Sequence, residues 1–289
     1  METSDLLKKV RKIEIKTKGL SANIFSGEYH SAFKGRGMSF SEVRSYQYGD
    51  DVRNIDWNVT ARTGAPFVKI FEEERELTVM LVIDMSRSAF IGTKAQFKNE
   101  MMTEVCAVLA FSAINNNDKV GVIFFSDRIE KFIPPKKGRS HILLIIRELL
   151  NFEPSGKGTN ISIALQYLNS VIKKRSICFM LSDFMTRGYE DALRIAAKRH
   201  DIVGIHTADP NEEQLPSVGL FRAVDAETGE RIWIDTDHPS VRATYANWYR
   251  DNFKYFKSIF NKTGVDFMSI RTTESYVNAM MKFFQSRAK

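Results

Sequence analysis

Cysteine is scarce in this sequence of 289 residues, which contains only Cys106 and Cys178. Both lie in apolar stretches, and neither has a second cysteine at CxxC spacing or a histidine nearby. Cysteine pairs and Cys–His combinations are typical of zinc sites and of redox or nucleophilic centres. We therefore interpret the two thiols as structural members of the hydrophobic core.

Long apolar segments are also missing. No run reaches the ~18 apolar residues that a membrane-spanning helix needs. The N-terminus, METSDLLKKVRKIEIKTK, is charged and lacks the apolar region of a secretory signal. The sequence therefore predicts no membrane span and a cytoplasmic location.

Blocks of positive charge are absent as well, although the chain is basic overall. Lysine and arginine total 42 against 35 acidic residues, which gives a formal net charge of +7. The basic residues are mixed with acidic ones and do not form the kind of arm that binds nucleic acid. We interpret them as dispersed solvated charges and expect no nucleic-acid partner, with nucleic-acid binding kept as an alternative function.

Hydrophobic residues make up 43% of the chain, enough for one large domain or for one domain with a smaller module. From Leu77 onward, continuous apolar segments alternate with segments of helical spacing. The expected strands are residues 77–84, 119–126, 129–133, 176–183, 201–208 and 266–271. The expected helices are residues 95–115, 139–150, 161–173, 189–199, 242–261 and 275–287, and residues 220–235 are expected to form a hairpin. Buried strands separated by helices predict an α/β fold with a doubly wound, mostly parallel sheet.

The first 76 residues differ from the rest of the chain. They contain several glycines, among them Gly27, Gly35 and Gly49, and only short apolar runs. We predict an irregular or β-rich arm over residues 1–76, packed on a core domain of residues 77–289. Trp57 and Ile55 are the side chains expected to attach this arm to the core.

A cluster of oxygen-bearing side chains follows the first buried strand. Asp84, Ser86 and Ser88 occupy alternate positions at the point where the apolar run ends. Alternate side chains of an extended chain point in the same direction, so the three can converge on one ion. Carboxylate and hydroxyl oxygens are the ligands that Mg²⁺ or Mn²⁺ prefers. The pattern alone is weak, because a serine after a strand is also a common turn or cap residue.

Two later segments can complete this set of oxygens. Asp183 follows another buried strand, and Thr159 lies in a Gly-Lys-Gly-Thr-Asn loop that opens a helix. In a parallel α/β sheet, ligands bind beyond the carboxyl ends of the strands, near a switch in strand order. The candidate ligands for Mg²⁺ or Mn²⁺ are therefore Asp84, Ser86, Ser88, Thr159 and Asp183.

Three stretches carry these residues, namely IDMSRS, GKGTNISIALQYL and CFMLSDF. They resemble the metal-ion-dependent adhesion site of von Willebrand factor A domains, and the resemblance spans about Leu77 to the C-terminus. It implies a Rossmann-like domain in which the serine pair and Thr159 ligate the ion. Asp84 and Asp183 would ligate it directly or through water, and a carboxylate of a partner would complete the shell. The resemblance thus implies a non-enzymatic, metal-dependent protein-binding module.

The N-terminal arm resembles a more specific family. The stretch GRGMSFSEVRSYQYGDDVRNIDWNVTARTG, followed by VKIFEEERELTVMLVID, resembles the bacterial family called domain of unknown function fifty-eight. Members join such an arm to an A-type domain, and they tend to be encoded beside MoxR-type AAA+ ATPases. The resemblance therefore implies an adaptor or co-chaperone that binds a MoxR-type AAA+ ATPase or a client of that ATPase.

The sequence does not match two enzyme classes that also place functional residues after buried strands. A phosphatase with an aspartate nucleophile needs a second carboxylate two residues later for proton transfer, and that position is Ser86. The loop around Thr159 does not match a phosphate-binding P-loop, because the threonine does not directly follow the lysine. We expect no enzyme activity. A Mg²⁺-dependent phosphoesterase stays open as an alternative, because a metal with a free position can bind phosphate.

Overall fold

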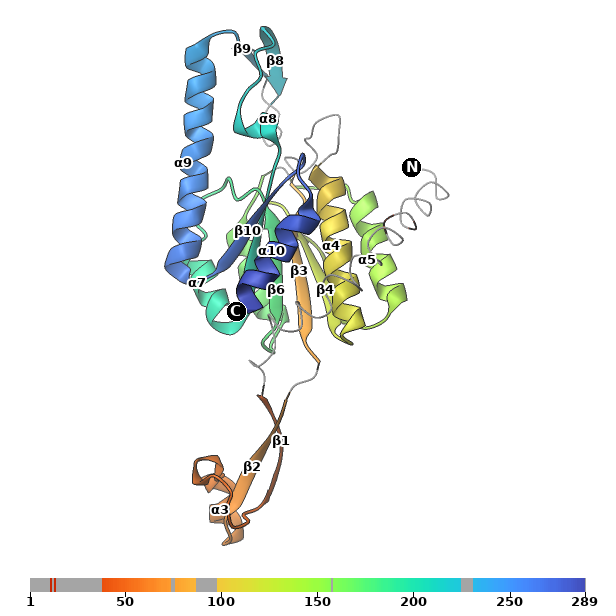
Figure 1. The fold of residues 1–289 in the computed structure, drawn as a ribbon, viewed down its shortest axis with the longest axis vertical. Helices are drawn as coiled ribbons and strands as arrows, with labels where there is room; N and C mark the ends of the chain where they lie inside the picture. Colours follow the sequence, from red (N-terminus) through yellow and green to blue (C-terminus); the bar gives the residue numbers. More distant parts are fainter. Residues whose placement is uncertain are drawn as a thin grey trace.

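The computed structural model describes residues 38–73, 76–86, 98–156, 158–224 and 231–288, together with residues 11 and 13. Figure 1 shows a central sheet flanked by helices, with a ribbon of two strands extending from one end. At the opposite end, a small hairpin and the first turns of a long helix rise beyond the sheet.

The central sheet has six strands in the order β10-β7-β6-β3-β4-β5. Their bounds are β3 (Thr78–Asp84), β4 (Lys119–Phe125), β5 (Ile129–Lys136), β6 (Ile177–Ser182), β7 (Asp201–Ala208) and β10 (Asp266–Arg271). Neighbouring strands are parallel except for β5, which forms an antiparallel edge against β4. The predicted α/β class and the mostly parallel, doubly wound sheet are confirmed.

The inner strands form because their central residues are apolar at consecutive positions. All six residues of β6 are buried, as are the last six of β3 and of β4. A strand with both faces covered has no solvent face, so its sequence shows no alternation between apolar and polar residues. This explains why continuous apolar runs predicted the strands correctly.

Within the described part of the chain, three helices cover each face of the sheet. One face carries α4 (Lys98–Asn115), α5 (Arg139–Asn151) and α10 (Tyr276–Ala288). The other face carries α6 (Ile161–Val171), α7 (Glu190–Arg199) and α9 (Pro239–Thr263). Each set packs its buried side chains against the sheet, so the molecule has two cores with the sheet between them.

The order of the strands reverses between β3 and β6. From β3 the chain moves through α4 to β4 and β5, and it later returns to β6 on the other side of β3. The helices that follow these two strands, α4 and α7, lie on opposite faces of the sheet. Such a switch point opens a crevice beyond the carboxyl ends of the two strands. Asp84 and Asp183 lie at those two ends.

A hairpin lies between β7 and α9. It is preceded by the short helix α8 (Pro210–Glu213) and consists of β8 (Leu220–Val224) and β9 (Arg231–Asp235), which pair in antiparallel fashion. The predicted hairpin is therefore confirmed, and its connecting residues lie outside the described ones. The long helix α9 begins at Pro239 and ends before Gly264, whose φ of 66° is the left-handed conformation that terminates helices.

The described part of the arm is an antiparallel ribbon. It contains β1 (Met38–Ser45), the 3-10 helix η2 (Val52–Asn54), α3 (Trp57–Thr63) and β2 (Phe67–Glu73). In Figure 1 the ribbon extends away from the amino ends of the sheet strands. Trp57 is 69% exposed, and Ile55 bridges to Val68 of the ribbon itself. In the described residues Trp57 is exposed and Ile55 pairs with the arm itself, so neither side chain is seen to attach the arm to the core.

Candidate functional site

Asp84 ends strand β3 and is 2% exposed. Its Oδ1 accepts the backbone N–H of Ser86 at 2.9 Å, a local turn that aspartate commonly forms after a strand. Its Oδ2 accepts the hydroxyl of Ser182, at the end of the neighbouring strand β6, at 2.6 Å. These two bonds hold the carboxylate in the crevice at the switch point, beside the buried Ser86.

The surroundings of Asp84 disfavour its negative charge. Burial and then the nearby carboxylate of Asp183 raise its pKa to about 6, although the hydrogen bonds from Ser182 and Ser86 act in the opposite direction. Desolvation and a like charge both favour the protonated acid. Near neutral pH the crevice therefore holds a buried carboxylate that a nearby cation would stabilise.

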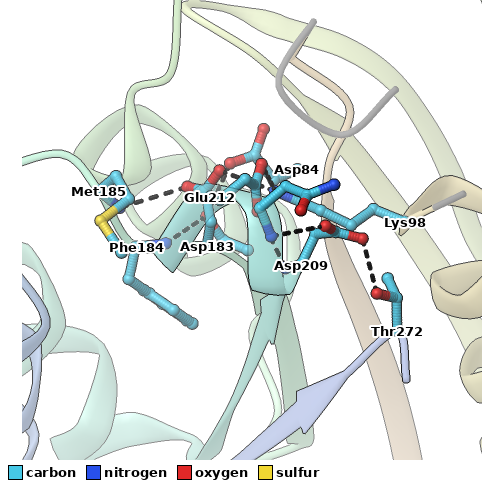
Figure 2. Close-up of polar contacts among 10 residues, drawn as sticks. Asp84, Lys98, Asp183, Phe184, Met185, Asp209, Glu212 and Thr272 are labelled. Atoms are coloured by element: carbon cyan, nitrogen blue, oxygen red, sulfur yellow. Dashed lines mark hydrogen bonds and ion pairs between the residues drawn. The ribbon is translucent and has the colours of Figure 1, made fainter. Parts of the chain in front are cut away.

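Asp183 follows β6 and points toward the same crevice (Figure 2). Its Oδ1 accepts the backbone N–H of Met185 at 3.2 Å. The next residue, Phe184, has a φ of 53°, which is an uncommon conformation for a residue with a bulky side chain. Its buried ring stacks on Phe256 of α9 with 4.7 Å between ring centroids. This packing stabilises the turn that aims Asp183 at the site.

Lys98, the first residue of α4, supplies a positive charge to the crevice and is only 1% exposed. Its Nζ lies 3.2 Å from Asp183 Oδ2, and 2.9 Å and 3.1 Å from the two carboxylate oxygens of Glu212 (Figure 2). Burial by itself lowers the pKa of Lys98, but the two carboxylates raise it above the usual value. The lysine is therefore charged, and it links the end of β6 to α8.

Glu212 reaches Lys98 because α8 begins with a capping box. Asp209, at the end of β7, accepts the N–H of Asn211 at 2.9 Å, and Glu212 accepts the N–H of Asp209 at 3.1 Å. The second oxygen of Asp209 accepts the hydroxyl of Thr272 at 2.7 Å. These bonds satisfy the exposed amides at the start of the helix. They also fix the carboxylate of Glu212 over the site.

Thr159 lies at the neighbouring part of the same edge. The backbone N–H of Asn160 donates to the carbonyl of Ser126, directly after β4, at 2.8 Å. The cap of α6 is Asn160, whose side chain accepts the N–H of Ile163 at 3.1 Å. Thr159 is half-buried and is not used as the helix cap.

The structure thus brings Asp84, Ser86 and Asp183 together and places the Thr159 loop beside them, whereas Ser88 lies outside the described residues. Among the residues that the structure describes, no three His, Cys, Asp or Glu side chains are arranged as a metal site. A metal at this edge would therefore depend on hydroxyl ligands. Two carboxylates with a buried serine and a threonine form a hard oxygen set that fits Mg²⁺ or Mn²⁺.

Sequence reasoning did not find Lys98 or Glu212. They are 114 residues apart and meet only because α4 and α8 both begin at the carboxyl edge of the sheet. Lys98 occupies an ordinary helix position in the sequence, and Glu212 resembles any acidic residue in the first turn of a helix. Nothing in the local pattern of either residue indicates a buried ion pair.

The fold and the site define an α/β protein with an acidic crevice at the switch point of its sheet. A family described as "Protein of unknown function DUF58" matches residues 42–255, and the chain belongs to this family. One relative is the "Uncharacterized protein Rv1480" of Mycobacterium tuberculosis, which is 28% identical over 283 residues, or 97% of this chain and 89% of the relative.

Two solved structures show limited similarity. BatB from Bacteroides thetaiotaomicron is 17% identical with a TM-score of 0.48, over 73% of this chain and 98% of that one. The SpRpn10 VWA domain is 10% identical with a TM-score of 0.41, over 72% of this chain and 94% of that one. Within the described ranges, none of the helices combines the length and the apolarity that crossing a membrane requires.

Proposed function

We propose that this protein is a non-enzymatic, metal-dependent protein-binding module. Asp84, Ser86, Ser88 and Thr159 would hold Mg²⁺ or Mn²⁺, and Asp183 would ligate it directly or accept a hydrogen bond from its bound water. When bound, the ion would offer an open position to a Glu or Asp side chain of the partner. The partner suggested by the family resemblance is a MoxR-type AAA+ ATPase or a client of that ATPase.

The proposal rests on the negative charge of the crevice. Asp84, Asp183 and Glu212 bring three carboxylates to the carboxyl edge of the sheet, and Lys98 contributes one ammonium. Lys98 contacts Asp183 and Glu212, whereas the described groups that donate to Asp84 are neutral and belong to Ser182 and Ser86. A divalent cation beside Asp84 would offset the remaining negative charge.

Metal binding is tested by thermal unfolding with and without Mg²⁺. A ligand at 100 times its dissociation constant stabilises the folded state by about 2.7 kcal/mol, so the midpoint of unfolding should rise with Mg²⁺. Asp84→Ala should abolish this rise. Asp191→Ala, which removes an exposed carboxylate on α7, is the matched control and should retain it. An equal rise in all three proteins would contradict the assignment.

Partner binding is tested with the purified MoxR-type ATPase of the same host, immobilised without nucleotide so that its own need for Mg²⁺ plays no part. Capture of this protein should be lost with EDTA, restored by excess Mg²⁺, and absent for Asp84→Ala. Equal capture with and without EDTA would contradict metal-dependent binding of the partner. Mg²⁺-dependent hydrolysis of a phosphate ester that disappears in Asp84→Ala would instead support the phosphoesterase alternative.

A further inference from the structure

A groove of about 560 Å³ lies between the β8–β9 hairpin and the first half of α9. Its walls include Leu215 after α8, Trp233 of β9, and Val241, Tyr245 and Trp248 of α9. Figure 1 shows that the hairpin and these turns of α9 stand beyond the carboxyl ends of the sheet strands. The groove is therefore on the same side of the molecule as the candidate metal site.

Two large aromatic side chains in the groove are exposed to solvent among the described residues. Trp233 is 65% exposed and Trp248 is 50% exposed. The ring of Trp248 lies against that of Tyr245, with 5.6 Å between ring centroids. Single exposed apolar residues are common, but clustered aromatic residues around a concavity are typical of binding surfaces. Tryptophan and tyrosine are also the residues that most often dominate binding energy.

The hairpin beside the groove carries two arginines. Arg222 is directly opposite Trp233 in the hairpin, and Arg231 precedes it by two positions, so the three side chains share one face. Both arginines are exposed, and neither forms an ion pair with a described carboxylate. Asp235 also lines the groove and contributes one negative charge, and its carboxylate accepts the backbone N–H of Asp237 at 3.0 Å. The two exposed guanidinium groups outnumber this carboxylate and favour an acidic occupant.

The groove lies near the candidate metal site. Helix α8, which carries Glu212, packs against α9, and Leu215 in the groove wall lies two residues after the end of α8. Burial raises the pKa of Tyr245, and the charges of Glu212 and Asp183 raise it further while Lys98 lowers it. The phenol in the groove wall is therefore within electrostatic range of the carboxylates in the crevice.

We propose that this groove receives a bulky apolar side chain from an acidic segment of a partner protein. A carboxylate of the same segment completes the metal site, and a second acidic group lies near Arg222 and Arg231. This inference rests on the proposed function, because it assumes that a partner carboxylate binds at the metal. It adds the chemistry of the partner: an acidic segment with at least one large apolar residue.

The test uses random 12-residue peptides displayed on phage and selected on the immobilised full chain in Mg²⁺. Enriched peptides are synthesised with a fluorescent label, and their affinities are measured by fluorescence anisotropy. The expected peptides contain Asp or Glu together with a bulky apolar residue. Trp233→Ala and Trp248→Ala should each weaken binding at least ~10-fold. Both residues are exposed, so the variants should fold, which circular dichroism checks.

A matched control separates this groove from exposed aromatic surface in general. Trp57→Ala removes an equally exposed tryptophan from the arm and should leave peptide affinity unchanged. The charge contribution is measured with Arg222→Gln and Arg231→Gln, which should reduce affinity for acidic peptides and flatten its dependence on salt.

The outcomes distinguish the groove from the metal site. If EDTA and Asp84→Ala abolish binding while the Trp233 and Trp248 variants bind normally, the groove is excluded and the proposed function stands. If the tryptophan variants lose binding but EDTA has no effect, metal-dependent docking fails. If the selection enriches no peptide, the proposal for the groove is contradicted. The proposal is also contradicted if the protein sediments with phosphatidylglycerol vesicles and the tryptophan variants do not, because the groove would then contact a membrane.

Discussion

At the scale of single residues, the candidate site depends on how its buried charges cancel. Lys98 holds Asp183 and Glu212 by direct ion pairs in a place where solvent is excluded. Two ions removed from water lose hydration, and only close pairing offsets that loss. The lysine is therefore a structural part of the site, whether or not a metal is present.

Lys98→Met should destabilise the protein by about 3 kcal/mol, because two carboxylates would remain buried without their cation. The double variant Lys98→Met with Glu212→Gln should recover part of this loss, since it also removes one of the two carboxylates left without a cation. Urea denaturation measures both free energies of unfolding. Equal stability of the wild type and Lys98→Met would show that the ion pairs are not formed.

Asp118 is another buried carboxylate and lies at the opposite edge of the sheet from the candidate site. It lies just before β4, and its Oδ1 accepts the backbone N–H of Leu77 at 2.9 Å. Its Oδ2 is buried and has no hydrogen-bond partner among the described residues. Burial raises the pKa of Asp118 to about 6.

The pH dependence of stability follows from that shift. Between about pH 4 and pH 6, the folded state binds more protons at Asp118 than the unfolded state does. The contribution of Asp118 to the free energy of unfolding therefore falls as pH rises. Asp118→Asn keeps the bond to Leu77 and removes the charge. Above pH 6 it should be more stable than the wild type by on the order of 1 kcal/mol, and this advantage should vanish near pH 4.

Urea unfolding at several pH values between 4 and 7.5 measures this difference. Asp191→Asn, which changes an exposed carboxylate, serves as the control and should follow the wild-type curve. An Asp118→Asn advantage that is the same at every pH would contradict the role assigned to the buried charge.

At the scale of elements, the fit between β7 and α9 depends on a glycine. A Cβ atom at Gly204 of β7 would lie 2.9 Å from Cζ of Phe260 and still closer to Cε1 of the same ring. Phe260 is fully buried in the core beneath α9. The absence of a side chain at Gly204 therefore lets the long helix approach the sheet.

Gly204→Ala should cost about 1–3 kcal/mol of stability, because a packed core cannot accept an extra methyl group without moving the ring. Adding Phe260→Leu should restore part of the loss by making room. Chemical denaturation of the single and double variants measures the effect. No loss in Gly204→Ala would mean that the helix lies farther from the sheet than described.

Element types were largely predictable from local sequence. The strands β3, β4, β6 and β7 appear as continuous apolar runs because both of their faces are covered. The arm was harder to predict. The apolar residues of β1 and β2 occur in short, irregular runs, and the pairing of the two strands brings together segments separated by η2 and α3.

At the scale of the whole molecule, the chain has two distinct ends. The candidate metal site, the hairpin and the groove are at the carboxyl edge of the sheet, and the described arm extends from the opposite edge (Figure 1). Most of the contacts of the arm are within the ribbon, where Arg44 and Asp50 form an ion pair at 2.7 Å. The arm is thus a separate surface from the site.

Trp57→Ala tests this arrangement. If the side chain is exposed as described, the free energy of unfolding should change by no more than about 0.5 kcal/mol. A tryptophan that anchored the arm in the core would instead cost about 3–5 kcal/mol when removed. Urea denaturation followed by circular dichroism distinguishes the two results.

The class of fold and the positions of Asp84 and Asp183 at strand ends were predictable from the sequence alone. These follow from local properties, because burial on both faces shapes each strand and polar residues mark where it ends. Tertiary structure decided the rest. Lys98 contacts Glu212, and Trp233 and Trp248 line one groove, because separate elements stack at one edge of the sheet. No local pattern records such contacts, since they depend on how the packed layers orient distant segments.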